Sequence, residues 1–269
     1  MNASTEARNA ATTAANSRAL TVLARIGYAA SGLVHLLLGY LAIRVALNRG
    51  GQSDQSGALS EVTQLPGGGV IIWVTVVGLA ALGLWLLIQA ALGIGSSSKK
   101  RWVRSVVSAG KAVAYLALGA TALSFAQGGS ASSSESSQNA SGSILALPGG
   151  QLLLALLGVA AVGVGGYFIF KGVTRKFTED IALPSGPAEK PIVALGVIGY
   201  IAKGVAVVAV GVLFVVAAIK VDPNGATGLD GALKSLADLP FGQAILIVVG
   251  AGLIAYGVYT FARARFARL

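Results

Sequence analysis

Cysteine is absent from this sequence of 269 residues, and Met1 and His35 are its only methionine and histidine. Disulfides, thiolate metal sites and cysteine nucleophiles are therefore excluded. A haem site at His35 would need a second axial ligand or an open distal position, and Met1 is the only methionine that could serve. We interpret His35 as a packing and hydrogen-bonding residue, because a proton relay would usually require acidic partners.

Acidic residues are few, and none of the ten lies within a long apolar stretch. Carboxylate-coupled transport, paired-carboxylate hydrolysis and divalent-metal catalysis inside such a stretch would all lack their ligands. The sequence also contains no phosphate loop with Gly-Lys-Ser/Thr, no G-x-S-x-G elbow and no H-E-x-x-H motif. We therefore expect a protein that is not an enzyme and that has no cofactor and no metal site.

Apolar residues dominate what is present. They make up 55% of the chain, charged residues only 11%, and the mean hydropathy is +0.76. Soluble domains usually carry about 25% charged residues, so this composition indicates a chain solvated mainly by lipid. A membrane-crossing helix needs roughly 20 apolar residues. Six stretches reach this length and predict an all-α polytopic membrane protein: 26–47, 70–93, 105–126, 151–172, 193–219 and 241–262.

Lys and Arg are distributed unevenly over the segments that connect these stretches. Fourteen of the 20 lie in the N-terminal segment, in the second and fourth connections and at the C-terminus, and only four lie on the opposite side. Short cytoplasmic loops retain positive charge, so both termini are predicted to be cytoplasmic. The net charge of +10 is thus mostly a topology signal. The expected partners are anionic lipid headgroups at the cytoplasmic face and other membrane proteins, and no nucleic acid.

Three internal repeats pair the six stretches. The first members contain "GYAASGLVHLLLG" (27–39), "VSAGKAVAYLALG" (107–119) and "GYIAKGVAVVAVG" (199–211), which align without gaps. The following loops end in "LPGG", "LPGG" and "LPFG", and from each proline the second member has a glycine 17 residues on and an aromatic residue 19 on. Two spans per repeat give all repeats the same orientation, which predicts three helical hairpins with pseudo-threefold symmetry.

These motifs resemble the bacterial membrane family called domain of unknown function 1206, which is common in actinobacteria. The resemblance covers about residues 25 to 266, although Val107 and Ser108 replace Gly and Tyr in the second repeat. It implies a fold and a location in the bacterial plasma membrane, and no activity. The expected organisation is a disordered cytoplasmic tail without a signal peptide (1–20), repeat 1 (21–95), repeat 2 (96–177), a cytoplasmic linker (178–190) and repeat 3 (191–269).

The loops inside the repeats have different sequence patterns, which predict different local structures. "GALSEVTQLPGG" (57–68) and "GALKSLADLPFG" (231–242) place apolar residues at helical spacing, so each predicts a short amphipathic helix ended by its proline. The serine-rich "GGSASSSESSQNASGS" (128–143) is typical of a flexible loop. The proline elbows are open to two interpretations, a structural turn or a re-entrant lid over a central cavity.

Each first-member helix carries polar and small residues along one face. Small residues seven apart allow membrane helices to approach closely, so we expect these helices to pack against each other or against their pair-mates, with the polar groups inward. The residues that define this packing and the turns are Gly32, Gly39, Gly119, Gly204, Gly211, Pro66, Pro148 and Pro240. The candidate intramembrane polar site contains Tyr28, Ser31, His35, Lys111, Tyr115, Tyr200 and Lys203.

Lys111 and Lys203 occupy one repeat position, about 10 Å inside the cytoplasmic end of their helices. A lysine there can extend to the headgroups and anchor its helix, can form a cationic site for an anionic headgroup or solute, or can act as a catalytic amine. Two functions remain open on these grounds. The chain is a non-catalytic scaffold or accessory subunit of a cell-envelope membrane complex, or a passive carrier or channel for an anionic solute or lipid.

Overall fold

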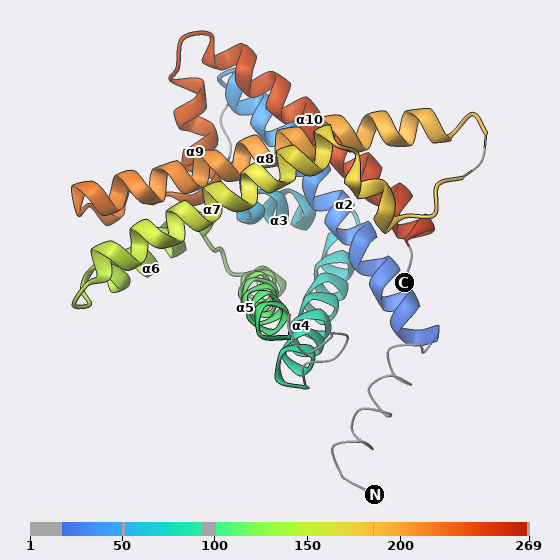
Figure 1. Cartoon of the computed structure of the whole chain (residues 1–269), viewed down its shortest axis with the longest axis horizontal. Helices are drawn as coiled ribbons and strands as arrows, with labels where there is room; N and C mark the ends of the chain where they lie inside the picture. Colours follow the sequence, from blue (N-terminus) through green and yellow to red (C-terminus); the bar gives the residue numbers. More distant parts are fainter. Residues whose placement is uncertain (1–17, 50–51, 93–100, 185, 268–269) are drawn as a thin grey trace, which may run out of the picture. The chain divides into compact units, whose positions relative to one another are not determined.

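The computed structural model describes residues 18–49, 52–92, 101–184 and 186–267 (Figure 1). These residues contain nine α-helices and two short 3-10 helices, and within them no strand forms beyond an isolated bridge between Ile181 and Ala267. The all-α prediction is therefore confirmed. Most of the predicted N-terminal tail lies outside the described residues, and its last three residues, 18–20, open the first helix instead.

The helices follow one another three times in the order long, short, long. In the first repeat these are α2 (Arg18–Ala46), α3 (Gln55–Thr63) and α4 (Gly68–Leu92), in the second α5 (Arg101–Ala126), α6 (Ser133–Leu145) and α7 (Gly150–Val173), and in the third α8 (Glu189–Lys220), α9 (Gly228–Ala237) and α10 (Gly242–Phe266). The 3-10 helices are η2 (Lys176–Asp180) and η3 (Pro223–Gly225).

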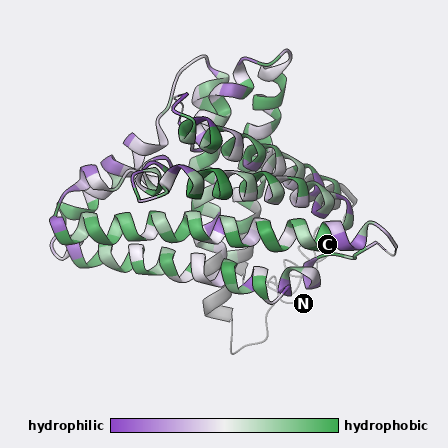
Figure 2. Ribbon diagram, turned by 90° about the horizontal axis from the view of Figure 1, so that it is seen from above, coloured by the Kyte–Doolittle hydropathy of each residue, from purple (hydrophilic) through white to green (hydrophobic). Residues whose placement is uncertain are grey.

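Five helices contain segments long and apolar enough to cross a membrane. In α4 the described apolar stretch is the shorter Gly68–Leu84, so five of the six predicted spans meet this criterion. Figure 2 shows hydrophobic residues along most of the length of the long helices and hydrophilic residues mainly near their ends. The five segments are Arg25–Ala46, Ser108–Ala126, Gly150–Val173, Glu189–Lys220 and Gly242–Phe266.

The chain forms two compact units. Unit 1 contains 62–130, and therefore α4 and α5, together with the N-terminal part of α2 up to Ala30. Unit 2 contains 31–61 and 131–268, which include the rest of α2, most of α3 and every helix from α6 onward. Each unit is built by close packing of long helices.

In unit 2, α7 and α8 lie side by side along their length and touch through glycine (Figure 1). A Cβ atom on Gly165 would lie 2.7 Å from the carbonyl oxygen of Gly204, and one on Gly158 would lie 2.8 Å from that of Gly211. No side chain larger than hydrogen fits at these points without movement. The seven-residue spacing places both glycines of each helix on one face, so the two backbones approach at two successive levels.

Helices α2 and α10 meet in the same way within unit 2. A Cβ atom on Gly257 would lie 2.8 Å from the carbonyl oxygen of Gly32, and one on Gly250 would lie 2.8 Å from that of Gly39. In unit 1, α4 and α5 pack together at the equivalent repeat positions, but there a glycine faces a larger side chain. There, a Cβ atom on Gly83 would lie 2.7 Å from Leu116.

The helix that each first-member helix packs against is not the one expected from the sequence. The first-member glycines of α2, α5 and α8 pack against a second-member helix of another repeat, and not against one another or their own pair-mates. The pair-mates α8 and α10 do touch elsewhere, where a Cβ atom on Gly199 would lie 2.5 Å from the Cα atom of Tyr256. Since α7 and α10 both carry two glycines seven residues apart, this spacing does not by itself select the partner.

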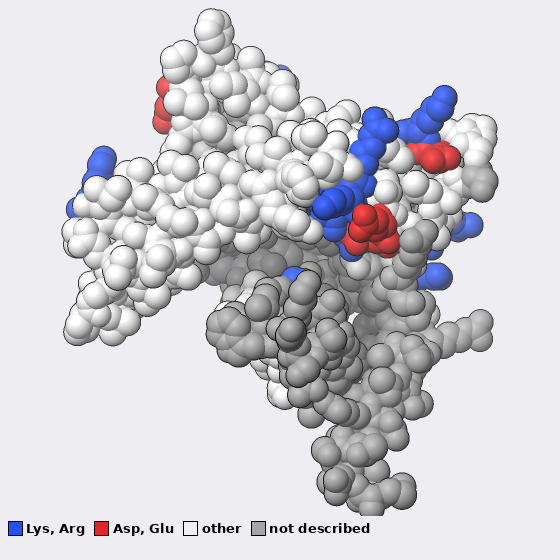
Figure 3. Space-filling model, in the orientation of Figure 1, with Lys and Arg blue, Asp and Glu red and all other residues white. Residues whose placement is uncertain are grey.

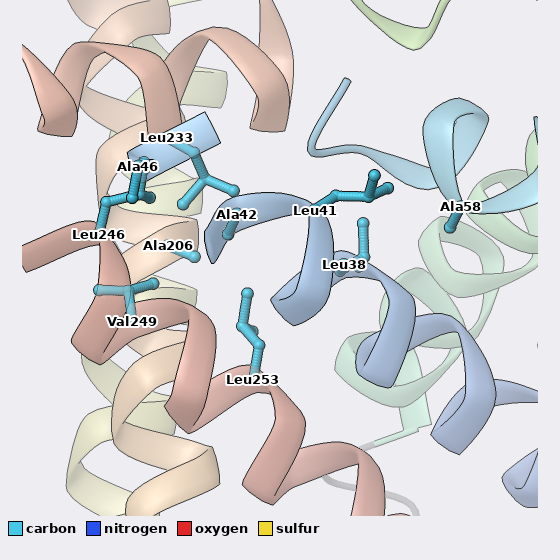
Figure 4. Packing of buried hydrophobic residues seen from close by; sticks show 10 residues of the cluster. All are labelled: Leu38, Leu41, Ala42, Ala46, Ala58, Ala206, Leu233, Leu246, Val249 and Leu253. Atoms are coloured by element: carbon cyan, nitrogen blue, oxygen red, sulfur yellow. The ribbon is translucent and has the colours of Figure 1, made fainter. Parts of the chain in front are cut away.

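The short helices α3 and α9 confirm the two predicted loop helices, and their apolar faces are buried. Ala58 and Leu233 belong to a core that also contains residues of α2, α8 and α10 (Figure 4). The prediction of a flexible serine-rich loop is wrong, because 133–143 belong to α6. Ser132 caps this helix by accepting a hydrogen bond from the backbone N–H of Glu135 at 3.1 Å. The S-x-x-E spacing from Ser132 to Glu135, typical of a capping box, is the sequence signal that marks the start of this helix.

The prolines Pro66, Pro148 and Pro240 each lie in the turn between a short helix and the long helix that follows it. The residue after each proline has a positive φ of 77°, 74° and 60°, and it is glycine in the first two turns and Phe241 in the third. The next glycine begins the following helix, where a Cβ atom would overlap a carbonyl oxygen of the short helix. The L-P-x-G motif thus joins two helices at van der Waals distance.

The first residues of the predicted linker, 178–190, pack against unit 2 together with the residue before them. Phe177 just before the linker and Ile181 within it are buried, and the backbone N–H of Ala182 donates to the carbonyl oxygen of Phe266 at 2.7 Å. The segment therefore closes over the adjacent ends of α7, α8 and α10 in unit 2.

Candidate functional site

An aromatic cluster fills one end of unit 2. It is built around Tyr200 of α8, whose ring stacks on Phe177 at a centroid distance of 5.3 Å and meets Tyr256 edge-on at 5.2 Å. Tyr259 contacts the same three rings. Tyr256 and Tyr259 come from α10, Phe177 comes from η2, and Phe168 of α7 lies 6.1 Å from Tyr200, so four segments contribute to the cluster. We use the name aromatic cluster for Phe168, Phe177, Tyr200, Tyr256 and Tyr259.

Two cations and one carboxylate surround this cluster. Asp180 accepts from the amine of Lys171 at 2.6 Å and lies 3.5 Å from the guanidinium of Arg263, which also donates to the hydroxyl of Tyr200 at 3.2 Å. The side chains of these three charged residues are 15% to 32% exposed. Lys171 and Arg263 occupy the same repeat position in α7 and α10. One carboxylate in the linker therefore binds equivalent basic residues of two repeats.

Lys203 faces aromatic rings and not a carboxylate. Its Nζ atom donates to the hydroxyl of Tyr256 at 3.3 Å and lies 4.4 Å from the centre of the Tyr256 ring and 5.2 Å from that of Phe168. Within the described ranges no Asp or Glu lies within 4 Å of this amine. Contact with ring faces stabilises a desolvated ammonium by about 0.5–2 kcal/mol. The protein thus supplies Lys203 with an electron-rich environment of its own.

His35 adjoins the same residues from α2. Its ring lies 4.7 Å from the ring of Tyr256, and its Nδ1 atom lies 2.7 Å from the carbonyl oxygen of Ser31, one helical turn earlier. Tyr256 is therefore contacted by His35 on one helix and Lys203 on another. His35 thus packs against Tyr256 and lies within hydrogen-bonding distance of a backbone carbonyl oxygen. Among the described residues no group of three or more His, Cys, Asp or Glu side chains is placed to hold a metal ion.

The structure brings some of the predicted site residues together. Tyr200, Lys203, His35 and the backbone of Ser31 are joined in unit 2 through direct contacts or through Tyr256. The other three lie in unit 1: Tyr28 and Tyr115 are partly buried there, and Lys111 is exposed on α5. Lys111 and Lys203 share a repeat position but not an environment.

Three residues of the site, Phe168, Tyr256 and Asp180, could not be found by comparing the three repeats. Phe168 and Tyr256 are aromatic at positions where the other repeats have no tyrosine or phenylalanine, and Asp180 lies in the linker outside the repeats. A signal for Tyr256 exists in its spacing from Tyr259 and Arg263, which places all three on one face of α10. Most charged side chains visible near α7 and α8 lie at one end of these helices, some basic ones lie near the opposite end, and the visible surface between the ends carries none (Figure 3).

These features define a helical membrane protein built from three tandem repeats, each with two long helices and a short helix between them. The family model described as Domain of Unknown Function (DUF1206) matches the chain three times, over residues 26–93, 106–175 and 198–267, and the chain belongs to this family. It is also similar to "Uncharacterized protein YxxB" of Bacillus subtilis (strain 168), with 32% identity over 242 residues that cover 87% of this chain and 86% of the relative. No solved structure matches.

Proposed function

We propose that this chain is a non-catalytic integral membrane protein that serves as a scaffold or accessory subunit of a cell-envelope membrane complex. The observation that supports this proposal most directly is the backbone contact between α7 and α8 and between α2 and α10, where no side chain separates the helices. Backbones in contact leave little freedom for one helix to slide along the other. Such rigidity suits a platform for other proteins better than a carrier that alternates between states.

We further propose six spans arranged with pseudo-threefold symmetry, in the bacterial plasma membrane and with both termini in the cytoplasm. Support comes from α4, whose 25 residues would extend about 37 Å and could cross a bilayer. Support for the symmetry comes from the three glycine-containing interfaces, which use equivalent repeat positions in α4–α5, α7–α8 and α10–α2. The basic loops, which would contact anionic headgroups, support the orientation.

Pull-down of the tagged full-length chain in a gentle detergent, followed by native mass spectrometry, tests the scaffold function. The expected result is a membrane-protein partner at fixed stoichiometry, retained when Lys111 and Lys203 are both replaced by leucine. Gly163→Ala, at a position with open space around it, serves as a matched control for handling and expression. A chain that remains without a protein partner after cross-linking in intact membranes would contradict the proposal.

A second candidate function is passive transfer or binding of an anionic lipid or solute. It is favoured by the Lys203 amine, which neighbours aromatic rings and has no carboxylate within 4 Å in the described ranges. In this case the Lys203→Leu variant should lose a co-purified phosphatidylglycerol or cardiolipin that Lys203→Arg keeps. Equal lipid content in both variants would exclude a headgroup site at Lys203.

A further inference from the structure

A second group of polar residues lies where three short helices of unit 2 meet. The backbone N–H of Ser53, just before α3, donates to Asp230 of α9 at 2.7 Å, and Ser56 of α3 hydrogen-bonds Ser133 of α6 at 2.6 Å between hydroxyls. A Cβ atom on Gly228 of α9 would lie 2.8 Å from the hydroxyl of Ser137 of α6. All three helix pairs are thus in contact. We use the name short-helix junction for Ser53, Asp54, Ser56, Ser133, Ser134 and Asp230.

The short-helix junction buries two carboxyl groups, and only one of them forms an ion pair within the described residues. Asp54 is completely buried and Asp230 is 5% exposed. Asp230 is paired with Lys234 at 2.7 Å, so its charge is balanced. In the part of the chain that the structure describes, no Lys or Arg lies within 4 Å of Asp54. Burying an unpaired carboxylate is costly, so Asp54 must either take up a proton or hold a cation.

Some buried oxygen atoms of the junction have hydrogen-bond partners and others have none. One oxygen of Asp54, Oδ1, accepts from the backbone N–H of Gly57 at 2.8 Å and caps α3. Its other oxygen, Oδ2, is buried and has no hydrogen-bond partner, and the same is true of the hydroxyls of Ser53 and Ser134. Ser53 and Asp54 are consecutive, and the Ser56–Ser133 hydrogen bond brings the start of α6 to the start of α3. Three buried oxygens without a partner therefore lie on segments that touch.

Oxygen is the ligand type that selects hard cations. Carboxylate, hydroxyl and backbone carbonyl oxygens bind Na⁺ and Ca²⁺, whereas the absence of cysteine from the chain excludes thiolate sites for softer metals. An anion is disfavoured, because the junction already holds the carboxyl groups of Asp54 and Asp230, and Lys234 pairs with Asp230 alone. Burial raises the pKa of Asp54 above its ordinary value, and the charge of Asp230 adds to this increase. A bound cation would stabilise the ionised form against both effects.

We propose that the short-helix junction binds a small hard cation, Na⁺ or Ca²⁺, through Oδ2 of Asp54 with the Ser53 hydroxyl as a neighbouring ligand. The cation neutralises Asp54 at the start of α3, where Ser53 and Ser56 hydrogen-bond α9 and α6. This site lies on different residues from the aromatic cluster, and it does not depend on the scaffold function.

Equilibrium dialysis of the purified full-length chain with radioactive Na⁺ or Ca²⁺ tests the proposal at pH 8 in gentle detergent, after treatment with a chelator and N-methylglucamine chloride. The expected result is one cation bound per chain, together with a higher midpoint of thermal unfolding than in N-methylglucamine alone. Comparison of NaCl with CaCl₂ at equal ionic strength identifies which of the two ions binds.

Variants separate this site from general charge effects. Asp54→Asn should abolish binding and the thermal shift, and Ser53→Ala should weaken binding by about tenfold. Asp238→Asn removes an exposed carboxylate just after α9 and should leave both unchanged. Absence of any bound cation in the wild-type chain overturns the proposal, as does equal binding by Asp54→Asn. A chain that is stabilised by acid but binds neither Na⁺ nor Ca²⁺ at pH 8 would show that a proton alone neutralises Asp54 and would also overturn it.

Discussion

Gly165 of α7 and Gly204 of α8 face each other backbone to backbone: a Cβ atom on either would lie 2.7 Å or 2.6 Å from the carbonyl oxygen of the other. Such distances are shorter than any ordinary contact of a methyl group. The pair therefore sets how closely the two helices approach, and with them the distance between the second and third repeats.

Gly165→Ala should lower the free energy of unfolding by about 1–3 kcal/mol, because the added methyl group forces α7 and α8 apart. The neighbouring Gly166 has no atom within 4 Å of an added Cβ and provides the matched control, since Gly166→Ala is expected to leave stability unchanged. Unfolding in mixed micelles with increasing sodium dodecyl sulfate measures both. Equal stability of the two variants would show that α7 and α8 are not in backbone contact at Gly165.

Asp180→Asn should destabilise unit 2 by about 1–2 kcal/mol, because Lys171 and Arg263 lose a shared counterion at partly buried positions. Glu189→Gln, at an exposed position early in α8, removes the same charge without breaking an ion pair and should have little effect. The midpoint of thermal unfolding at low salt, followed by circular dichroism, distinguishes them. A smaller difference in 1 M NaCl would confirm that the effect is electrostatic.

Phe241→Gly should raise stability by about 1 kcal/mol, because Phe241 has a φ of 60° that glycine adopts without strain. The side chain is 87% exposed, so its removal costs little packing. Phe241→Ala keeps the Cβ atom and the unfavourable backbone conformation, and it should give no gain. If alanine stabilised the chain as much as glycine, relief of backbone strain would not be the cause.

The stability of the wild-type chain should fall as pH rises through the range in which Asp54 ionises. Burial raises the pKa of Asp54 in the folded state, so the folded chain binds this proton more tightly than the unfolded chain. The contribution of Asp54 to stability is therefore fully present below the unfolded-state pKa of about 3.9 and is lost as pH rises through the raised folded-state pKa. Comparison of chemical unfolding across pH for the wild type and Asp54→Asn isolates this contribution in the absence of added Na⁺ or Ca²⁺. A pH dependence shared by both would assign it to other groups.

The helices and their repetition could be predicted because both depend on local pattern. Long apolar stretches have few folds available in lipid other than the helix, and L-P-x-G turns recur where backbone geometry requires them. Helix α6 was predictable in principle from Ser132 and Glu135, yet its polar composition is equally typical of a flexible chain. Its order comes from contacts with α7, α9 and η3, which no local pattern reveals.

The candidate site was predictable only in part. Tyr200, Lys203 and His35 stand out as polar residues in apolar helices, but Tyr256, Phe168 and Asp180 become partners only when α7, α8, α10 and the linker are brought together. Lys111 and Lys203 are equivalent by repeat alignment. One is exposed on α5 and the other faces two aromatic rings, because the residues around each position differ between repeats.

The sequence by itself determined an all-α membrane chain of three tandem repeats, since hydrophobic length, loop charge and repeat spacing are properties of the chain alone. The tertiary structure decided which helix each glycine face meets, because α7 and α10 present the same seven-residue glycine spacing. It also decided that Asp54 is buried with no Lys or Arg within 4 Å among the described residues, while Asp180 is shared by two cations. Charge compensation depends on distances of a few ångströms between segments far apart in sequence, and only packing sets those distances.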